Sequence, residues 1–205
     1  MRARITLLVG VALCLSGAAI ALATVLTGHH ARHARATLIG PRMPAHLRAV
    51  DFVLHDQNGR PVRLADTRGH VVVMTFLHSE CRSTCPVTAQ TIRGALDDIG
   101  AQRRDVAALA ITVAPREDSR RHVDAFLRGQ HVASFLRYLT GPVPAVRAVW
   151  KRYGIHPLTH GEDHTAFVFL IDRRGIMRVG YPSHEMTPED LAHDLRVLVA
   201  ERPAA

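Results

Sequence analysis

The sequence predicts an α/β domain, with a central sheet flanked by helices, preceded by an N-terminal transmembrane helix. Short apolar runs alternate with segments of helical periodicity, which is typical of α/β domains. One apolar run leads directly into a close pair of cysteines at the start of a helix. An uncharged apolar stretch near the N-terminus is long enough to cross a membrane. Together these features indicate one globular domain behind a membrane anchor.

The apolar stretch covers residues 5–27 and follows Arg2 and Arg4. A helix of about 20 apolar residues spans a bilayer core, whereas the core of a signal peptide has about 7–15 residues. We therefore predict a membrane anchor over 1–27, with a cleaved signal sequence as the alternative because Ala21-Leu22-Ala23 resembles a cleavage site. The two arginines would stay inside. The chain would then be a single-pass protein of the cell membrane, with its domain on the extracytoplasmic side.

The composition fits a globular domain and gives no indication of nucleic-acid binding. Hydrophobic residues make up 47% of the chain and charged residues 21%, whereas a disordered chain would be poorer in apolar residues. The net charge is +8, and half of that excess comes from arginines within residues 1–35. The remainder has no dense basic face. We therefore expect a membrane partner through the N-terminal helix and no nucleic-acid partner.

Residues 28–45 have the composition of a linker, since Gly28, Gly40, Pro41 and Pro44 interrupt them and no apolar period is present. This segment contains a short run of histidines, which are His29, His30 and His33. We interpret the run as a solvated basic spacer, and metal binding is the alternative. The globular domain is predicted over residues 46–205.

The domain is predicted to open with a hairpin. Its strands cover 51–54 and 62–64, and Asn58-Gly59 would supply the positive-φ residues of the turn. Residues 71–77 are apolar on both faces, as expected of a central strand. A helix should follow Pro86 and end at Gly100, because proline is tolerated in a first helical turn.

The remaining elements follow from the same alternation of short apolar runs and helical periods. Strands are predicted at 106–113, 136–139, 166–171 and 177–180, and helices at 116–128 and 143–153. The last helix should begin after Thr187, which has the properties of an N-cap followed by proline. A strand that enters a cysteine pair at a helix start is the thioredoxin arrangement, so we predict a thioredoxin-like fold.

Cys81 and Cys85 are the residues most suited to chemistry. A helix N-terminus lowers a thiol pKa, and Arg82 adds positive charge, so both sulfurs are expected to be primed as thiolates. A thiolate is a nucleophile and also a metal ligand. Soft thiolates favour Cu(I) and suit zinc, but a structural zinc site needs four protein ligands. A structural disulfide is the alternative, although it would close too small a loop to stabilise the fold much.

A third ligand would have to come from a distant part of the chain. His164 is the candidate, because it directly precedes the predicted strand 166–171 and so lies at a strand end. Its alternative role is that of a capping or core histidine. We interpret His78 as solvent-facing, and a supporting role beside the cysteine pair is its alternative. We interpret His156, His160 and His184 as surface residues, with an approach to the rim of the same site as their alternative. The remaining cysteine, Cys14, fits a small apolar residue within the anchor.

Three motifs, in order along residues 46–202, resemble the Sco/SenC family of copper chaperones. Cys81-Arg82-Ser83-Thr84-Cys85-Pro86 between a strand and a helix resembles the family's Cys-x-x-x-Cys-Pro site. Residues 163–167, followed by Leu170-Ile171-Asp172, are similar to its distal histidine motif. Residues 112–119 are similar to its Val-Asp-Pro-x-x-Asp-Thr segment.

The resemblance implies that Cys81, Cys85 and His164 are copper ligands. It also implies copper delivery to the binuclear centre of cytochrome c oxidase subunit II, or another copper-accepting protein, or reduction of that centre's cysteines. The chain departs from the family pattern at three places: Glu80 where a histidine is common, Arg82-Ser83 where Pro-Asp is frequent, and Ala114 in place of an aspartate. The expected cofactor is Cu(I), with Cu(II) as a further possibility.

Two functions from different classes fit these residues. In the first, the protein is a copper-binding assembly factor without turnover chemistry. In the second, it is a thiol–disulfide oxidoreductase, in which Cys81 and Cys85 attack and resolve a partner disulfide. A pure reductase has no need of His164, so this histidine separates the two. No Thr-x-x-Cys context that would indicate a peroxidase surrounds Cys81.

Overall fold

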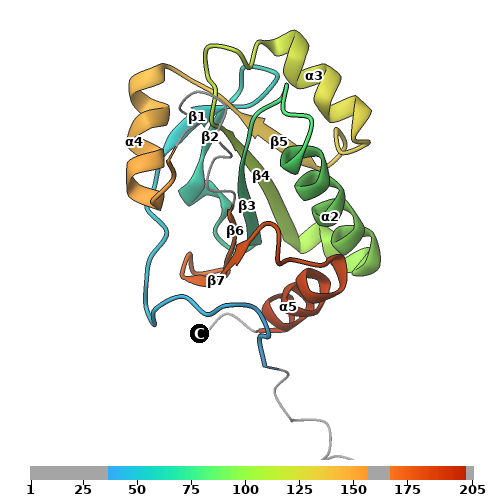
Figure 1. The fold of residues 1–205 in the computed structure, drawn as a ribbon. Helices are drawn as coiled ribbons and strands as arrows, with labels where there is room; N and C mark the ends of the chain where they lie inside the picture. Colours follow the sequence, from blue (N-terminus) through green and yellow to red (C-terminus); the bar gives the residue numbers. More distant parts are fainter. Residues whose placement is uncertain (1–36, 157–166, 202–205) are drawn as a thin grey trace, which may run out of the picture. The chain divides into compact units, whose positions relative to one another are not determined.

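The computed structural model describes residues 37–156 and 167–201, which form an α/β domain (Figure 1). Its strands are β1 (Val53–His55), β2 (Pro61–Arg63), β3 (Val71–Leu77), β4 (Val106–Thr112), β5 (Leu136–Leu139), β6 (Phe167–Ile171) and β7 (Met177–Pro182). Its helices are α2 (Thr84–Asp98), α3 (Arg120–Gly129), α4 (Val143–Tyr153) and α5 (Pro188–Ala200), with short 3-10 segments at Leu64–Thr67 and Gly100–Asp105. The predicted thioredoxin-like arrangement of a central sheet between helices is confirmed.

The main sheet has the strand order β5-β4-β3-β6-β7. β3 lies at its centre, parallel to β4 and antiparallel to β6. All seven residues of β3 are buried, as predicted from its apolar run. In the β3–β4 register Leu77 is opposite Thr112. The two strands therefore end side by side, and the loop after β3 lies next to the loop after β4.

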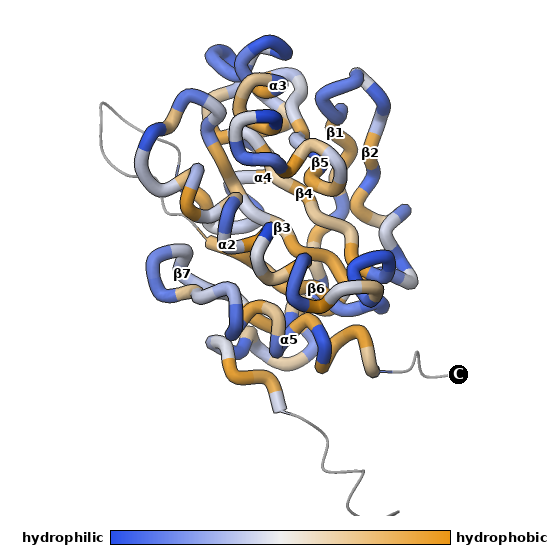
Figure 2. Tube along the Cα trace, turned by 90° about the vertical axis from the view of Figure 1, so that its right-hand side faces the viewer, coloured by the Kyte–Doolittle hydropathy of each residue, from blue (hydrophilic) through white to orange (hydrophobic). Residues whose placement is uncertain are grey.

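Helices cover both faces of the sheet, and each face has its own apolar core. Alternate residues of β3 point to opposite sides, so that Val73 and Leu77 join one core and Met74 and Phe76 the other. The first core contains residues of α2, α3 and α5, and the second contains residues of α4 and the β1–β2 hairpin. Figure 1 shows α4 on the opposite side of the sheet from α2 and α5. In Figure 2 the central strands are mainly hydrophobic and the hydrophilic segments lie largely in loops.

The predicted hairpin is present, with strands at Val53–His55 and Pro61–Arg63. Its turn differs from the prediction, because Gly59 has a positive φ of 78° and Asn58 does not. The carboxylate of Asp56 accepts hydrogen bonds from the backbone N–H groups of Asn58 (2.8 Å) and Arg60 (2.9 Å). This aspartate organises a longer loop, so the tight two-residue turn was a wrong prediction.

Helix α3 begins at Arg120, four residues later than predicted. Residues 114–118 instead form a turn, in which the N–H groups of Glu117 and Asp118 donate to the Ala114 carbonyl (2.9 Å each). Ser119 is the N-cap, since its hydroxyl accepts from the His122 N–H at 3.3 Å. The predicted start at Arg116 was wrong because serine is the better N-cap.

The end of the predicted linker packs on the domain. Asp194 of α5 is fully buried and accepts hydrogen bonds from the N–H groups of Ile39 (2.8 Å) and Gly40 (3.0 Å). The Met43 N–H donates to the Arg178 carbonyl of β7 at 3.0 Å. The chain is thus part of the fold from about Leu38 onward. The predicted anchor at 5–27 and the histidines at 29, 30 and 33 lie outside the described residues. Within 37–156 and 167–201, no helix has the length and apolar character needed to span a membrane.

Candidate metal centre

The two cysteines lie where β3 gives way to α2, as the sequence predicted. Cys85 is the second residue of α2 and is fully buried, whereas Cys81 lies in the preceding loop and is partly exposed. Because α2 starts only at Thr84, Cys81 is not helical, and its position is set by the loop. One sulfur thus lies within the core and the other at its edge.

Backbone hydrogen bonds of His78 hold this loop against the helix. The Cys81 N–H donates to the His78 carbonyl at 3.2 Å, which closes a turn over residues 78–81. The His78 N–H lies 3.4 Å from Cys85 Sγ and donates to it. The backbone of His78 therefore contacts both cysteines of the pair.

Asp118 connects this loop to the rest of the domain. Its carboxylate is buried and accepts hydrogen bonds, at 2.5 to 2.8 Å, from Ser79 N, Ser79 Oγ, Thr112 Oγ1 and Tyr138 Oη. Ser79 belongs to the loop of residues 78–83, here called the cysteine loop, whereas Thr112 ends β4 and Tyr138 belongs to β5. A single buried side chain thus fixes the loop to two strands. The sequence placed Asp118 within a motif but did not reveal this role.

The environment of the two thiols is strongly asymmetric. Burial raises the pKa of Cys81, but hydrogen bonds from the Ser83 side chain and from the backbone of Cys85 and Ser83 outweigh it, so this pKa lies below its ordinary value. The Ser83 hydroxyl lies 3.5 Å from Cys81 Sγ. Burial raises the pKa of Cys85 far above its ordinary value, and a negative charge on Cys81 adds to the effect. The predicted lowering of the pKa is thus correct in direction for Cys81, although hydrogen bonds rather than Arg82 or the helix N-terminus cause it. It is wrong for Cys85, whose burial outweighs the effect of the helix N-terminus.

This asymmetry predicts the order in which the thiols react with iodoacetamide. Cys81 should be alkylated first, because it is partly exposed and more readily forms a thiolate. The reaction should be followed by mass spectrometry of peptides across pH 6–10. We expect the midpoint for Cys81 to lie below that of an unperturbed cysteine in a short model peptide measured in parallel, because the pKa of Cys81 is lowered by its hydrogen bonds. The Cys81→Ser variant should lose the fast phase and Cys85→Ser should keep it, and the reverse pattern would contradict this assignment.

His78 is not solvent-facing, contrary to the prediction. Its side chain is only 12% exposed, and Nε2 lies 3.2 Å from a carboxylate oxygen of Glu117. The loop after β4 covers the ring because β3 and β4 end side by side. Sequence alone gives no signal for this contact, since Glu117 is 39 residues away along the chain.

The other predicted site residues fall into two groups. His164 and His160 lie outside the described residues, as does Cys14, so the predicted third copper ligand is not placed. His156 and His184 are exposed, as predicted. The structure therefore brings together Cys81 and Cys85, and it leaves the convergence of His164 with them as a prediction.

The chain resembles known proteins in both sequence and structure. A family model described as SCO1/SenC matches residues 42–200. The structure of Bradyrhizobium japonicum ScoI with copper bound is 28% identical, with a TM-score of 0.62, and the match covers 74% of this chain and 99% of that chain. The apo Sco1 protein from Thermus thermophilus is 25% identical, with a TM-score of 0.66, and the match covers 80% of this chain and 99% of that chain.

A SCO2-like protein of Rickettsia prowazekii is 25% identical over 133 residues, which are 60% of this chain and 64% of that protein. The chain thus spans less than two thirds of the length of this curated relative. The solved structures are matched over nearly their whole length, so the similarity covers the complete thioredoxin-like domain.

Proposed function

Because this chain belongs to the SCO1/SenC family, whose model matches residues 42–200, we propose that it binds copper and delivers it to, or matures, the binuclear copper centre of cytochrome c oxidase. The solved relative from Bradyrhizobium japonicum has copper bound. The observation that carries the proposal is the cysteine pair itself, with one sulfur at the surface of the domain and one beneath it.

Cys81 and Cys85 would supply two soft sulfur ligands and His164 a neutral imidazole. Thiolates favour Cu(I) over harder cations. Cu(I) is the cargo of this site, and Cu(II) is a second form that it could hold. We propose that the domain lies on the extracytoplasmic side of the cell membrane, anchored by residues 1–27 and joined through residues 28–45. The acceptor would be cytochrome c oxidase subunit II or another protein that offers copper ligands.

The asymmetry of the thiols gives copper transfer a direction. Cys81 is partly exposed, so an acceptor's ligand can replace it first. Cys85 is fully buried and would be the last protein sulfur to leave the ion. Its thiolate is costly without a cation nearby, because burial raises its pKa. Binding of Cu(I) would offset that cost and displace the Cys85 proton to solvent.

Copper affinity should therefore depend on pH. Since the pKa of Cys85 is raised far above neutrality, its proton must be displaced by copper at every pH from 6 to 8. Each proton released changes the apparent affinity by about tenfold per pH unit, so Cu(I) affinity should rise at least about tenfold per unit. Competition against a chromophoric Cu(I) chelator measures this slope. An affinity that does not change with pH would contradict the raised pKa of Cys85.

The proposal is tested by the same competition assay on the full-length chain in detergent. Cys81→Ser and Cys85→Ser should each weaken Cu(I) binding by more than about 100-fold. Replacing a residue that only hydrogen-bonds to a metal ligand already lowers metal affinity about 10- to 100-fold, and loss of the ligand itself should cost more. Cys14→Ser is the matched control, because it removes the third cysteine of the chain and should leave the affinity unchanged. Equal affinities in all three variants would reject the copper site.

The thiol–disulfide oxidoreductase remains a second candidate, because the thiols also suit that chemistry. The pKa of Cys81 is lowered by hydrogen bonds, as in an attacking thiol, and buried Cys85 is placed to resolve a mixed disulfide. Turnover of a disulfide substrate by the wild-type domain, unaffected by His164→Ala, would favour this function. Copper binding that requires His164 would favour the first.

A further inference from the structure

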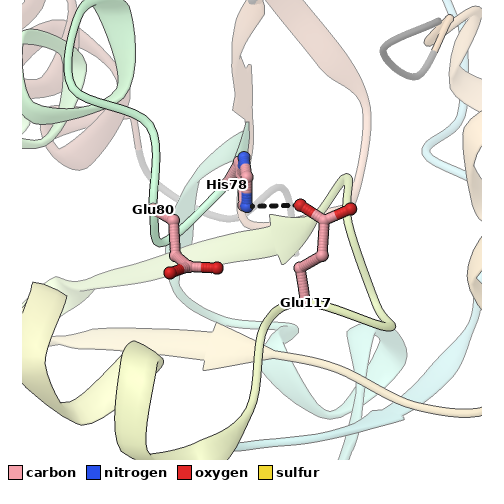
Figure 3. A group of neighbouring side chains, drawn as sticks. All are labelled: His78, Glu80 and Glu117. Atoms are coloured by element: carbon pink, nitrogen blue, oxygen red, sulfur yellow. Dashed lines mark ion pairs between the residues drawn. The ribbon is translucent and has the colours of Figure 1, made fainter. Parts of the chain in front are cut away.

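A second cluster of metal-ligating side chains lies beside the cysteine pair. His78, Glu80 and Glu117 each offer one ligand atom, and these atoms all lie within 4.8 Å of one another. Figure 3 shows the His78 ring and the Glu117 carboxylate pointing toward each other, with the Glu80 carboxylate alongside. Glu80 belongs to the loop after β3 and Glu117 to the loop after β4. The side-by-side ends of the two strands thus bring the three side chains together.

His78 Nε2 has the environment of a metal ligand. The atom is shielded from solvent and has no hydrogen bond of acceptable geometry, although Glu117 Oε2 lies 3.2 Å away. A carboxylate oxygen of Asp118 lies 4.0 Å away, and it already accepts hydrogen bonds from Ser79. A buried nitrogen without a hydrogen bond is costly. If Nε2 carries a lone pair, it faces the Glu117 carboxylate, and a cation bound between the His78 ring, Glu117 and Glu80 would satisfy that lone pair.

The spacing and the exposure of the ligands suit the site. Two ligands bonded at about 2.0–2.1 Å to one tetrahedral ion lie about 3.3 Å apart, close to the observed separation of His78 and Glu117. The Glu117 side chain is 63% exposed and that of Glu80 is 49% exposed, so both can close on an ion. The His78 ring, whose side chain is only 12% exposed, would be the fixed ligand.

His122 orients the third ligand. Its Nδ1 lies 3.3 Å from a carboxylate oxygen of Glu80 and 3.0 Å from the Glu117 carbonyl oxygen. Both neighbours are acceptors, so Nδ1 carries the proton and donates to them. Ligating carboxylates are commonly held by such hydrogen bonds, which fix their orientation.

We propose that His78, Glu80 and Glu117 form a separate site for a divalent transition-metal ion. One imidazole and two carboxylates suit Cu(II) and Zn(II), whereas the cysteine pair suits Cu(I). The backbone N–H of His78 contacts Cys85 Sγ while its ring faces the carboxylates, so the two sites adjoin through one residue. This site goes beyond the proposed Cu(I) function and does not depend on it.

The test uses Cu(II) as the probe and the full-length Cys81→Ser/Cys85→Ser chain, which cannot bind through these thiolates. Equilibrium dialysis gives the number of ions bound, and electron paramagnetic resonance reports their ligands. We expect Glu80→Gln/Glu117→Gln to lose one bound ion per chain or to weaken it at least about tenfold. His78→Phe should also remove the nitrogen signature of this ion.

The matched control is Glu185→Gln/Glu189→Gln, which removes the same two charges from exposed positions elsewhere. Glu185 also lies beside a histidine, with a carboxylate oxygen 3.4 Å from His184 Nε2, and so resembles the pair of Glu117 and His78. The control double variant should leave copper stoichiometry unchanged. Equal losses in the two double variants, or no loss in either, would overturn the site and assign the bound Cu(II) to other groups such as the N-terminal histidines. Retained Cu(I) binding by Glu80→Gln/Glu117→Gln with intact cysteines would separate this result from the fate of the Cu(I) site.

Discussion

Replacing Asp118 with alanine is expected to lower the free energy of unfolding by about 3 kcal/mol. The change leaves the partly buried Ser79 N–H and the buried Thr112 hydroxyl without an acceptor, and a buried group without a partner costs about 1–3 kcal/mol. Tyr138 is less affected, because its hydroxyl also lies 2.8 Å from the Leu77 carbonyl and can donate there. For a domain of this size the melting temperature should fall by about 10 °C, which thermal denaturation measures.

The same variant should loosen the cysteine loop, because Asp118 is the side chain that fixes Ser79 to β4 and β5. We expect faster alkylation of Cys85 in Asp118→Ala than in wild type, well below the melting temperature. Tyr138→Phe is the control, since it removes one of the donors and should cost only about 1 kcal/mol. Identical stability and thiol reactivity of Asp118→Ala and wild type would contradict the role of this carboxylate.

Replacing Asp194 with alanine is expected to release the segment before β1 from α5 and β7. The buried carboxylate accepts from the N–H groups of Ile39 and Gly40 and from the Tyr181 hydroxyl at 2.6 Å. The backbone of Gly40 packs directly against Tyr181, since a Cβ at this position would lie 2.3 Å from the Tyr181 ring. Loss of the carboxylate should cost about 2–4 kcal/mol, because it leaves buried donors without an acceptor.

Limited proteolysis with trypsin measures this release directly. Arg42 pairs with β7 through an isolated bridge to Val179, so cleavage after it requires the segment to detach. We expect cleavage at Arg42 to accelerate in Asp194→Ala and to change little in Tyr181→Phe, which loses one hydrogen bond. If Arg42 is cut at the wild-type rate in Asp194→Ala, the segment is held by other contacts.

The fold was predictable because its signals are local. Residues 71–77 are apolar on both faces except for Thr75, and a short run of this kind rich in β-branched residues is typical of a buried strand at the centre of a sheet. The start of α5 followed from Thr187 and Pro188, and the structure confirms the cap, in which the Thr187 hydroxyl accepts from the Asp190 N–H. The start of α3 was misplaced because residues 114–118 form a turn that the apolar pattern alone did not reveal. Ser119 then caps the helix after this turn.

The electrostatics of the site were less predictable, because they depend on contacts between distant residues. Sequence identified Cys81 and Cys85 by their spacing, but the opposite pKa shifts follow from how deeply each sulfur is buried. Asp118 reaches the cysteine loop only because β3 and β4 pair in parallel with Leu77 opposite Thr112. The same register buries His78 against Glu117, a contact that no local pattern encodes.

The central claim is that Cys81, Cys85 and His164 bind a single Cu(I) ion. X-ray absorption spectroscopy of the full-length chain loaded with one equivalent of Cu(I) tests it most directly, because it reports the ligand atoms of the metal. We predict two sulfur ligands and one nitrogen ligand in wild type, with the nitrogen lost in His164→Ala and retained in His156→Ala, which changes an exposed histidine. A sulfur-only environment in wild type, or a nitrogen that persists in His164→Ala, would contradict the claim.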